Sequence, residues 1–264
     1  WNESYQRPVR AAVMEGLDPV AEMGSTLYTA LFNGPLEGFF RRSQVGYKVL
    51  VMQILFTGFE ALRINAVMSL GIGAAIIVIG TSLLPQFGQS QLLYTILIIV
   101  ITRELGPLLT AFVVIARSGT AIATELGTMV VSHEIEAYLS VGVNPISYLV
   151  VPRFLGMVAS MLILTIYFNI FGLLGSFLVV QVVRPVGFQE YFRNLLTTLT
   201  VSDILSGLGK SVIFGAITSV VATYQGFSVT RASTEIPVAG IRAVGQSFML
   251  CILADVVITL MQYV

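Results

Sequence analysis

The sequence predicts an all-α polytopic membrane protein with five transmembrane helices, an interfacial amphipathic helix before them and a short helix between spans two and three. Two observations predict this class. Hydrophobic residues make up 56% of the 264 residues and charged residues only 11%, whereas a soluble domain carries about 25% charged residues. Five apolar stretches are also long enough to cross a bilayer core of about 30 Å, which takes roughly 20 helical residues.

We place the five spans at residues 65–84, 91–116, 148–183, 204–224 and 244–264. Residues 45–63 are apolar too, but they contain Glu60 and Arg63, which can pair at helical spacing. That segment either extends the first span or forms a helix of its own. Residues 45–264 are therefore expected to form one transmembrane domain.

Residues 1–44 have a different pattern and are expected to form a separate N-terminal region. Apolar residues recur there at helical spacing and make one face: Val20, Met23, Leu27, Tyr28, Leu31 and Phe32. The basic, aromatic sequence Phe39-Phe40-Arg41-Arg42 follows. An amphipathic helix with such an end suits the headgroup plane of a membrane. The alternative is a short soluble cap.

The distribution of basic residues predicts the orientation of the chain, because cytoplasmic segments carry an excess of Lys and Arg. With a cytoplasmic N-terminus, the outside loops hold only Arg184 and Arg193. The inside segments then hold Arg7, Arg10, Arg41, Arg42, Lys48, Arg117, Arg153, Arg231 and Arg242. Five crossings place the C-terminus outside, and the largest inside connection is residues 117–147.

Four charged residues interrupt the expected spans: Arg103, Glu104, Lys210 and Asp255. A charge in the middle of a membrane helix costs ~2.5–3.5 kcal/mol on insertion scales, so such residues usually face a cavity or one another. All four fall at similar depth and can neutralise one another. One interpretation is a salt-bridge cluster that only holds helices together. The other is a polar patch that meets a lipid headgroup or moves during transport.

Pro107 follows this charged pair and should disturb the second span. It removes a backbone donor and crowds the carbonyl of Arg103, so we expect a kink there. The kink either serves packing alone or belongs to the substrate-binding or gating region with the four charges.

The inside connection is expected to contain a short helix over residues 132–142. Ser132 is a plausible N-cap, Glu134 and Glu136 suit the first turn, and Gly142 suits the C-terminal end. The helix also carries His133 and an exposed aromatic residue, Tyr138. The alternative is a bare cytoplasmic loop. Glu136-Ala137 followed by Gly142 resembles the coupling-helix signature of ABC importer permeases.

The residue content excludes several kinds of site. His133 is the only histidine and Cys251 the only cysteine, so we expect no histidine-based metal site or triad and no internal disulfide. The sequence Gly207-Leu208-Gly209-Lys210-Ser211 looks like the end of a phosphate-binding loop, but the first glycine of that motif would fall at Ile204 and no strand precedes it. The chain is therefore expected to bind no nucleotide, metal or other cofactor itself.

Several motifs between residues 103 and 153 carry a family resemblance. They are Arg103-Glu-Leu-Gly-Pro107, Ala116-Arg-Ser-Gly119, Ala123-Thr-Glu-Leu-Gly-Thr-Met129, Asn144-Pro145 and Val151-Pro-Arg153. Their order and spacing closely resemble the MlaE (YrbE-like) permease family, and Lys210-Ser211 and Ala254-Asp255 extend the resemblance. Three positions depart from the family pattern: Ala116 where glycine is frequent, Thr124 where alanine is usual and His133 where glutamate is usual.

The resemblance implies an all-helical homodimer with two cytoplasmic ATPase subunits, which would hold ATP and Mg. It also implies a periplasmic partner of the MCE type and a glycerophospholipid substrate. Ser132, His133, Glu134, Glu136, Tyr138 and Gly142 would couple to the ATPase, and Arg117, Glu125 and Arg153 would form a structural charged motif.

We therefore expect a non-enzymatic permease subunit of an ATP-driven phospholipid transporter in a bacterial inner membrane. It would exchange lipid with the MCE-type partner and support outer-membrane lipid asymmetry or trafficking. The alternative is an ion channel or an intramembrane enzyme that uses the four buried charges. The absence of a nucleophile–base pair favours the permease.

Overall fold

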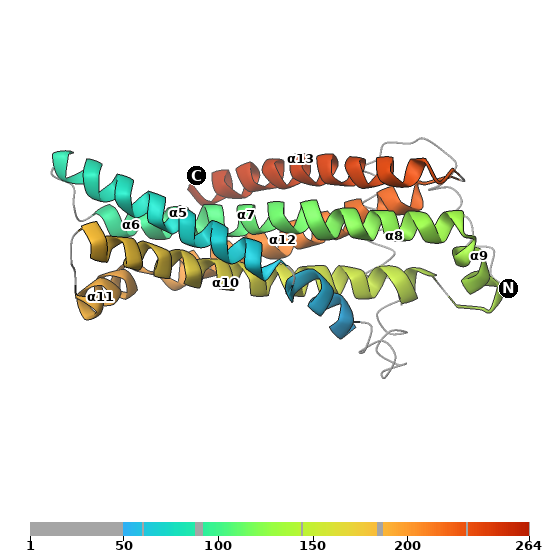
Figure 1. Cartoon of the computed structure of the whole chain (residues 1–264), viewed down its shortest axis with the longest axis horizontal. Helices are drawn as coiled ribbons and strands as arrows, with labels where there is room; N and C mark the ends of the chain where they lie inside the picture. Colours follow the sequence, from blue (N-terminus) through green and yellow to red (C-terminus); the bar gives the residue numbers. More distant parts are fainter. Residues whose placement is uncertain are drawn as a thin grey trace. The chain divides into compact units, whose positions relative to one another are not determined.

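The computed structural model describes residues 50–59, 61–87, 92–143, 145–183, 187–230 and 232–263, and these ranges contain helices, turns and no strand (Figure 1). Five helical segments are long and apolar enough to cross a membrane: Leu62–Gln86, Leu92–Val131, Tyr148–Val182, Val201–Phe227 and Glu235–Gln262. The predicted all-α, five-span class is confirmed. The predicted N-terminal helix of residues 1–44 lies outside the described residues.

The helices follow one another along the chain with short connections. After a π-helical turn η1 (Leu55–Phe59) come α5 (Leu62–Leu83), η2 (Leu84–Phe87), α6 (Leu92–Ile98), η3 (Ile99–Leu105), α7 (Gly106–Val114), η4 (Ile115–Gly119), α8 (Thr120–Val131) and α9 (Glu134–Ser140). The C-terminal half contains η5 (Ile146–Val150), α10 (Val151–Val183), α11 (Phe188–Thr198), α12 (Val201–Phe227) and α13 (Glu235–Tyr263).

The second span is longer than predicted. Its helical run covers 40 residues, from Leu92 to Val131, whereas the sequence pattern predicted an end at Ala116. At about 1.5 Å per residue this run measures roughly 60 Å, about twice the thickness of a bilayer core. Residues 117–131, which we assigned to the inside connection, are therefore mostly α8. The chain remains helical beyond the apolar stretch on which the prediction was based.

The contacts divide the chain into two compact units. Of the described residues, the first unit holds residues 50–53, Ile115–Met157 and Ala216–Leu250, and the second holds Ile54–Val114, Val158–Gly215 and residues 251–263. The long helices α10, α12 and α13 contribute residues to both units. The charged residues expected in the membrane fall in the second unit, and the expected coupling helix falls in the first.

In the second unit, glycines let α5 and α10 approach closely. A Cβ atom on Gly73 would overlap the carbonyl oxygen of Gly172, and one on Gly175 would meet the backbone of Leu70. Only hydrogen fits at such a contact between helix backbones, as at other close helix crossings in membranes. By contrast, a Cβ on Gly71 would meet nothing within 4 Å. Gly73 thus serves the packing of α5 against α10 within one chain.

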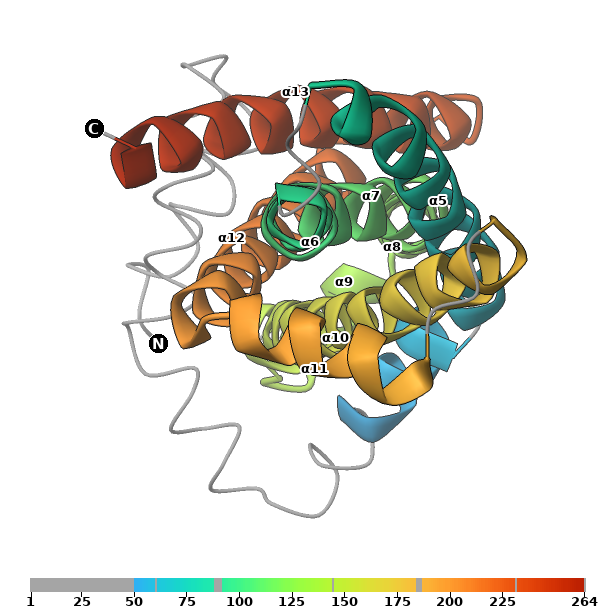
Figure 2. The same ribbon diagram turned by 90° about the vertical axis from the view of Figure 1, so that its left-hand side faces the viewer.

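The short helix α11 is fixed in the second unit by Tyr191. This side chain is fully buried, its hydroxyl lies 2.6 Å from that of Ser176 on α10, and its ring contacts those of Tyr94 and Phe177. Burial raises the pKa of Tyr191 to about 12, so the phenol stays neutral at physiological pH. Figure 2 views this unit end-on, with α6 in contact with α5 and α11. The anchored α11 fixes where α12 begins.

In the first unit, glycines on α12 and α13 allow these helices to pack closely against α8. A Cβ on Gly226 would crowd Ala123 and Leu126, and a Cβ on Gly240 would lie 3.1 Å from the methyl carbons of Thr120 and Thr124. The Thr124 hydroxyl donates to carbonyls of its own helix. Threonine at this position is therefore accommodated opposite Gly240 without an unsatisfied hydroxyl.

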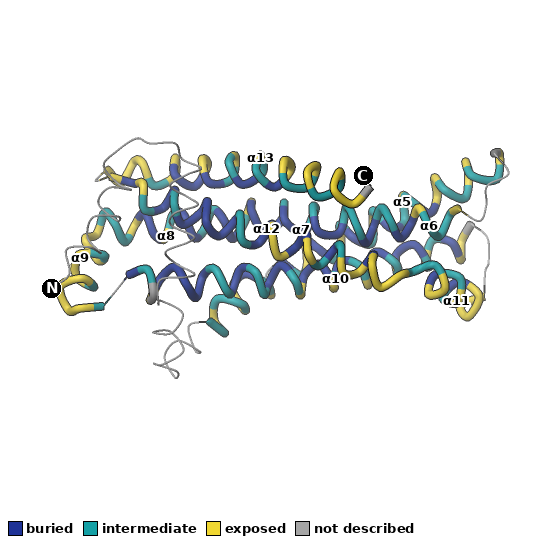
Figure 3. Tube along the Cα trace, turned by 180° about the vertical axis from the view of Figure 1, so that it is seen from behind, coloured by how far each residue is buried: buried dark blue, intermediate teal, exposed yellow. Residues whose placement is uncertain are grey.

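The spans differ in how much of their surface the chain itself covers. In the most apolar window of each span, 56% of the residues are buried in the second span but only 11% in α13 and 17% in the α5 span. Figure 3 shows exposed residues recurring along α13, among them Ile241, Met249 and Met261. These apolar surfaces suit lipid chains or another membrane helix.

Candidate functional site

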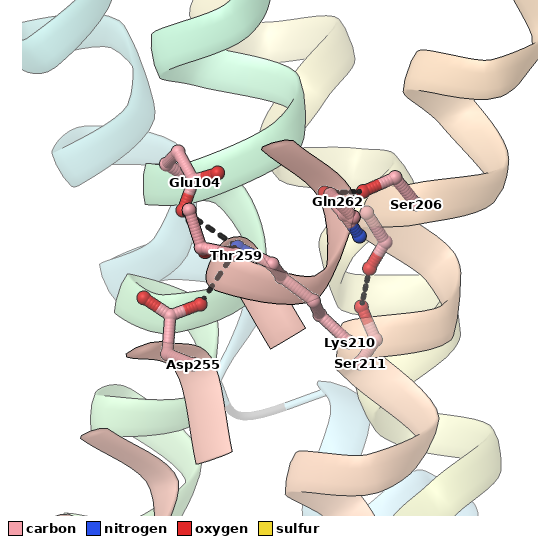
Figure 4. Close-up of polar contacts among 8 residues, drawn as sticks. Glu104, Ser206, Lys210, Ser211, Asp255, Thr259 and Gln262 are labelled. Carbon is pink, nitrogen blue, oxygen red and sulfur yellow. Dashed lines mark hydrogen bonds and ion pairs between the residues drawn. The ribbon is translucent and has the colours of Figure 1, made fainter. Parts of the chain in front are cut away.

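Lys210 is the centre of a buried polar network in the second unit. Its side chain is 0% exposed, although lysine is almost never fully buried unless it is paired. Its Nζ lies 2.6 Å from Glu104 Oε2 and 2.8 Å from Asp255 Oδ1, and it donates to Thr259 Oγ1 at 2.8 Å. Figure 4 shows these side chains converging on the lysine nitrogen. One cation is thus held by two carboxylates and a hydroxyl.

Three helical segments supply the network. Glu104 belongs to the π-helical turn η3 and Lys210 to α12. Asp255 and Thr259 are four residues apart on α13, and residues at this spacing share one face of a helix. Thr259 also donates to Glu104 Oε2 at 3.3 Å. Thr259 was not among the predicted site residues, although its spacing from Asp255 was a usable signal.

Arg103 pairs with an acid that the sequence analysis did not select. Its Nε lies 2.6 Å from Asp203 Oδ1. The other oxygen, Asp203 Oδ2, accepts from the backbone N–H of Thr200 at 2.9 Å and from its hydroxyl at 2.6 Å. Thr200 and Asp203 thus form a cap at the start of α12. Of the four charges expected to neutralise one another, Glu104, Lys210 and Asp255 meet as one cation between two carboxylates. Arg103 instead has Asp203 as an ion-pair partner.

Pro107 lies in α7, directly after the π-helical turn that carries Arg103 and Glu104. The N–H of Gly106 donates to the carbonyl of Ile101, five residues earlier, which is the π-helical pattern. A π-helical turn widens the helix before a proline and is a known site of helix distortion. The π-helical turn η3 thus lies directly before the position where the kink was predicted, and it carries Glu104. The kink itself stays a prediction.

The network carries a strong energetic constraint. Lys210 contributes one positive charge against the two carboxylates of Glu104 and Asp255. Burying charges away from water is tolerated only when each is paired and hydrogen-bonded, and removing one partner leaves an uncompensated charge. Lys210 therefore keeps two acids of different helices together, and any movement of α12 or α13 in this unit would change those contacts.

The expected coupling helix is present as α9, with corrected boundaries. It covers Glu134–Ser140, and Glu134 and Glu136 lie in its first turn as predicted. The prediction that Ser132 is its N-cap is wrong, because Ser132 ends α8 and its hydroxyl donates to the carbonyl of Thr128. The N-cap is His133, which has a left-handed backbone with φ of 58°. Ser132 lies between two helices, and its hydrogen bonds belong to the preceding helix, α8.

The C-terminal end of α9 agrees with the prediction at Gly142. Gly142 has φ of +76°, a conformation that glycine adopts without strain. The N–H of Val143 donates to Tyr138 and that of Gly142 to Leu139, at 2.9 and 3.1 Å. This is the bonding pattern of a Schellman cap, so α9 has a sharply defined end.

The surface of α9 is open. No residue of the helix is buried, and Leu139 and the adjoining Val141 are 46% and 72% exposed. Tyr138 packs against the ring of Tyr148 with centroids 5.5 Å apart, and His133 Nδ1 lies 3.2 Å from Glu136 Oε2. The side chains of α9 are therefore accessible from outside this unit.

A second ion pair lies in the first unit. Arg153 on α10 is 7% exposed and donates to Glu125 on α8 at 2.8 Å and to the carbonyl of Leu149 at 2.9 Å. Two members of the predicted charged motif are thus brought together. The third, Arg117, lies in η4.

The amino-acid sequence of this chain is similar to that of several known proteins. Residues 50–261 match the family model described as Permease MlaE. A probable ABC transporter permease protein of Rickettsia typhi is 30% identical over 214 residues, which cover 81% of this chain and 83% of that protein. The intermembrane phospholipid transport system permease protein MlaE of Haemophilus influenzae is 26% identical over 252 residues, 95% of this chain and 94% of that protein. The chloroplastic protein TRIGALACTOSYLDIACYLGLYCEROL 1 of Arabidopsis thaliana is 28% identical over 218 residues, 83% of this chain and 62% of that protein.

Proposed function

Because this chain belongs to the MlaE permease family of ABC transporters, we propose that it carries glycerophospholipids through the membrane in a complex driven by ATP hydrolysis on separate subunits. The single observation that supports this most directly is the Lys210 network. Charged residues inside membrane helices usually mark substrate pathways. Here three of them, on three helical segments, meet at distances below 3 Å. Arg103, Glu104, Lys210, Asp255 and Pro107 would line or gate the lipid path.

The open surface of α9 supports a partnership with an ATPase. In this proposal Ser132, His133, Glu134, Glu136, Tyr138 and Gly142 position or form the contact, with ATP and Mg held by the partner. His133 at the N-cap has a left-handed backbone, so it shapes the entry into α9 as well as presenting a side chain. The N-terminus and α9 would then be cytoplasmic and the C-terminus periplasmic, in the inner membrane of a bacterium.

Two further partners complete the proposal. The sparsely covered surfaces of α13 and the α5 span would meet lipid and a second copy of the chain, since a two-fold dimer can enclose a cavity between its copies. An MCE-type periplasmic protein would exchange lipid with this dimer. The relative from Haemophilus influenzae is named as part of an intermembrane phospholipid transport system, which supports a role in lipid trafficking to the outer membrane.

Reconstituted transfer tests the proposal. The chain is purified with its ATPase subunits and placed in vesicles that contain a fluorescent phospholipid, and transfer to acceptor particles is followed with ATP and with a non-hydrolysable analogue. We expect transfer with ATP only. Ion current without ATP, or no lipid transfer by an assembled complex that hydrolyses ATP, would contradict the proposal and favour a channel or an enzyme. Native mass spectrometry that finds one copy per active complex would contradict the dimer.

A further inference from the structure

His133 lies at the corner between α8 and α9 and has two features that set it apart. It is the only histidine of the chain, and histidine is the side chain whose charge ordinarily changes between about pH 5 and pH 8. Among the described residues it is also the only one other than glycine with a positive φ, 58°. Histidine adopts this left-handed conformation more readily than most residues. A side chain that can change charge near neutral pH thus lies where the chain turns into α9.

The backbone of His133 is joined to both helices. Its N–H donates to the carbonyl of Val130 at 3.2 Å, and its carbonyl accepts from the N–H of Ala137 at 3.1 Å. The imidazole makes no capping bond to the start of α9. Instead, Nδ1 lies 3.2 Å from Glu136 Oε2, and the two side chains are 60% and 73% exposed. Both groups can therefore exchange protons with water and can reach a partner protein.

A proton on His133 would change how it binds Glu136. A neutral imidazole donates from one nitrogen only, whereas a protonated one donates from both. The bond from Nδ1 to the carboxylate then joins two opposite charges, and such bonds are shorter and stronger than neutral ones. The helix carries two acids, Glu134 and Glu136, and no basic residue. Protonation of His133 therefore leaves this surface with one net negative charge instead of two, and it occupies one of the two carboxylates.

The other groups around His133 bring no further charge that changes in this pH range. Residues 128–131, in the last turn of α8, contain no charged side chain, and neither do residues 141–143 after α9. The turn η5 contributes Tyr148, whose ring packs against that of Tyr138. Tyrosine ordinarily stays neutral below about pH 9. Within the described part of the chain, the imidazole and the two acids of the first turn therefore determine the charge of this surface.

From these observations we propose that His133 makes the contact between α9 and its ATPase sensitive to pH, so that a proton on the imidazole weakens the contact. A partner that fits an acidic surface carries basic residues, because charges across an interface are complementary. The proton adds a positive charge to α9 and pairs Glu136 within the chain, so the attraction falls. This inference rests on the proposed docking of an ATPase on α9 and adds a form of regulation to it. A fall in cytoplasmic pH then loosens the coupling of ATP hydrolysis to lipid transfer.

The first test measures affinity at two pH values. The full chain in lipid nanodiscs is titrated with the ATPase subunit that copurifies with it, at about pH 6 and about pH 8, on either side of the range in which histidine titrates. We expect the wild-type chain to bind about threefold to fivefold more weakly at the lower pH, because one unit charge acts across an exposed contact. The difference should shrink at high salt, which screens exposed charges.

Two variants separate His133 from ionisable groups of the ATPase. His133→Asn is neutral at both pH values and suits a left-handed backbone, and His133→Lys is positively charged at both. Each should bind with the same affinity at both pH values, and the lysine variant should bind more weakly than the asparagine variant. A second measurement follows the imidazole itself. Because the chain has one histidine, an untagged chain with isotope-labelled histidine gives one imidazole signal by nuclear magnetic resonance. Docking of unlabelled ATPase should lower the protonated fraction at a given pH, since linkage between the proton and the ATPase is reciprocal.

Three outcomes would overturn the inference. They are equal or tighter binding of the wild-type chain at the lower pH, the same pH dependence in His133→Asn as in wild type, and an imidazole whose protonated fraction does not change on docking. Failure of the proposed docking is separate. If the ATPase binds Glu136→Lys with Tyr138→Ala as tightly as wild type, α9 is not the contact, and the pH inference falls with it. If that double variant loses binding while wild-type affinity is the same at both pH values, only the role of His133 fails.

Discussion

The Lys210 network and the Arg153–Glu125 pair have similar distances but very different surroundings. Lys210 is 0% exposed and lies within 2.8 Å of two carboxylates, whereas the Glu125 side chain is 50% exposed. The Arg153 side chain is itself only 8% exposed, but without Glu125 it would keep the carbonyl of Leu149 as a partner. Water can also reach this contact from the side of Glu125, whereas Lys210 is fully enclosed. Exposed ion pairs contribute little to stability, while breaking a buried pair is strongly destabilising. Burial, more than distance, should therefore decide which of the two sites contributes more to stability.

The largest effect is expected for Lys210→Ala. It leaves Glu104 and Asp255 without their shared cation, and loss of one partner of a buried ion pair costs about 3–5 kcal/mol. The free energy of unfolding in detergent should fall by this amount. Lys210→Met is the matched control for side-chain volume and should be nearly as damaging. Wild-type stability in both variants would show that Lys210 is not the centre of the network.

A smaller effect is expected from the interaction between Lys210 and Asp255. Removing Asp255 as well relieves one of the stranded charges, so Lys210→Ala with Asp255→Ala should be more stable than Lys210→Ala alone. A double-mutant cycle on melting and on lipid transfer measures this, with an expected coupling of about 0.5–3 kcal/mol. Strict additivity would show that the two residues do not interact. Full transfer by the double variant would leave the pair with a structural role only.

At Glu125 the expected change is smaller again. Glu125→Gln keeps a side chain of the same size beside Arg153 and removes its charge. Because half of the Glu125 side chain is exposed, the loss in unfolding free energy should be about 0.5–1 kcal/mol. Melting in low and high salt measures it, and the difference should shrink as salt rises. A loss of unfolding free energy as large as that of Lys210→Ala would contradict the ranking of the two sites by burial.

The smallest change in stability is expected on α9. Glu136→Lys with Tyr138→Ala alters a helix that has no buried residue, so insertion and melting should stay close to wild type. Assembly with the ATPase or ATP hydrolysis by the complex should be lost, because the altered residues lie on the proposed contact surface. Copurification and ATPase assays measure this. Normal assembly and activity would count against α9 as the coupling helix.

The sequence was sufficient to predict that the chain has five spans and that Glu104, Lys210 and Asp255 lie close together. Long apolar stretches predict membrane helices because the bilayer thickness sets their length. The cost of a buried charge explains why these three find one another. The pattern could not place the end of the second span, since α8 continues as a helix after the apolar stretch ends.

Two side chains show where sequence reasoning stopped. Asp203 lies at the start of α12, and its spacing from Thr200 is that of a helix cap. That signal was readable, but it does not reveal that the same carboxylate pairs with Arg103 on another helix. Ser132 suits either of two adjoining helices by residue type, and its hydrogen bonds to the carbonyl of Thr128 assign it to the first. Such choices depend on tertiary contacts that a single sequence does not display.

The π-helical turn η3 makes the direction of Glu104 depend on chain length as well as on side-chain identity. A π-helical turn holds more residues than an α-helical turn at the same place. Deletion of one residue between Ile99 and Leu105 would let this segment close into a regular α-helix. The extra residue is accommodated within the turn, so the helix on either side would keep its direction. The residues of the turn itself, Glu104 among them, would change their positions. The position of Glu104 therefore tolerates substitutions around it better than a change in residue count.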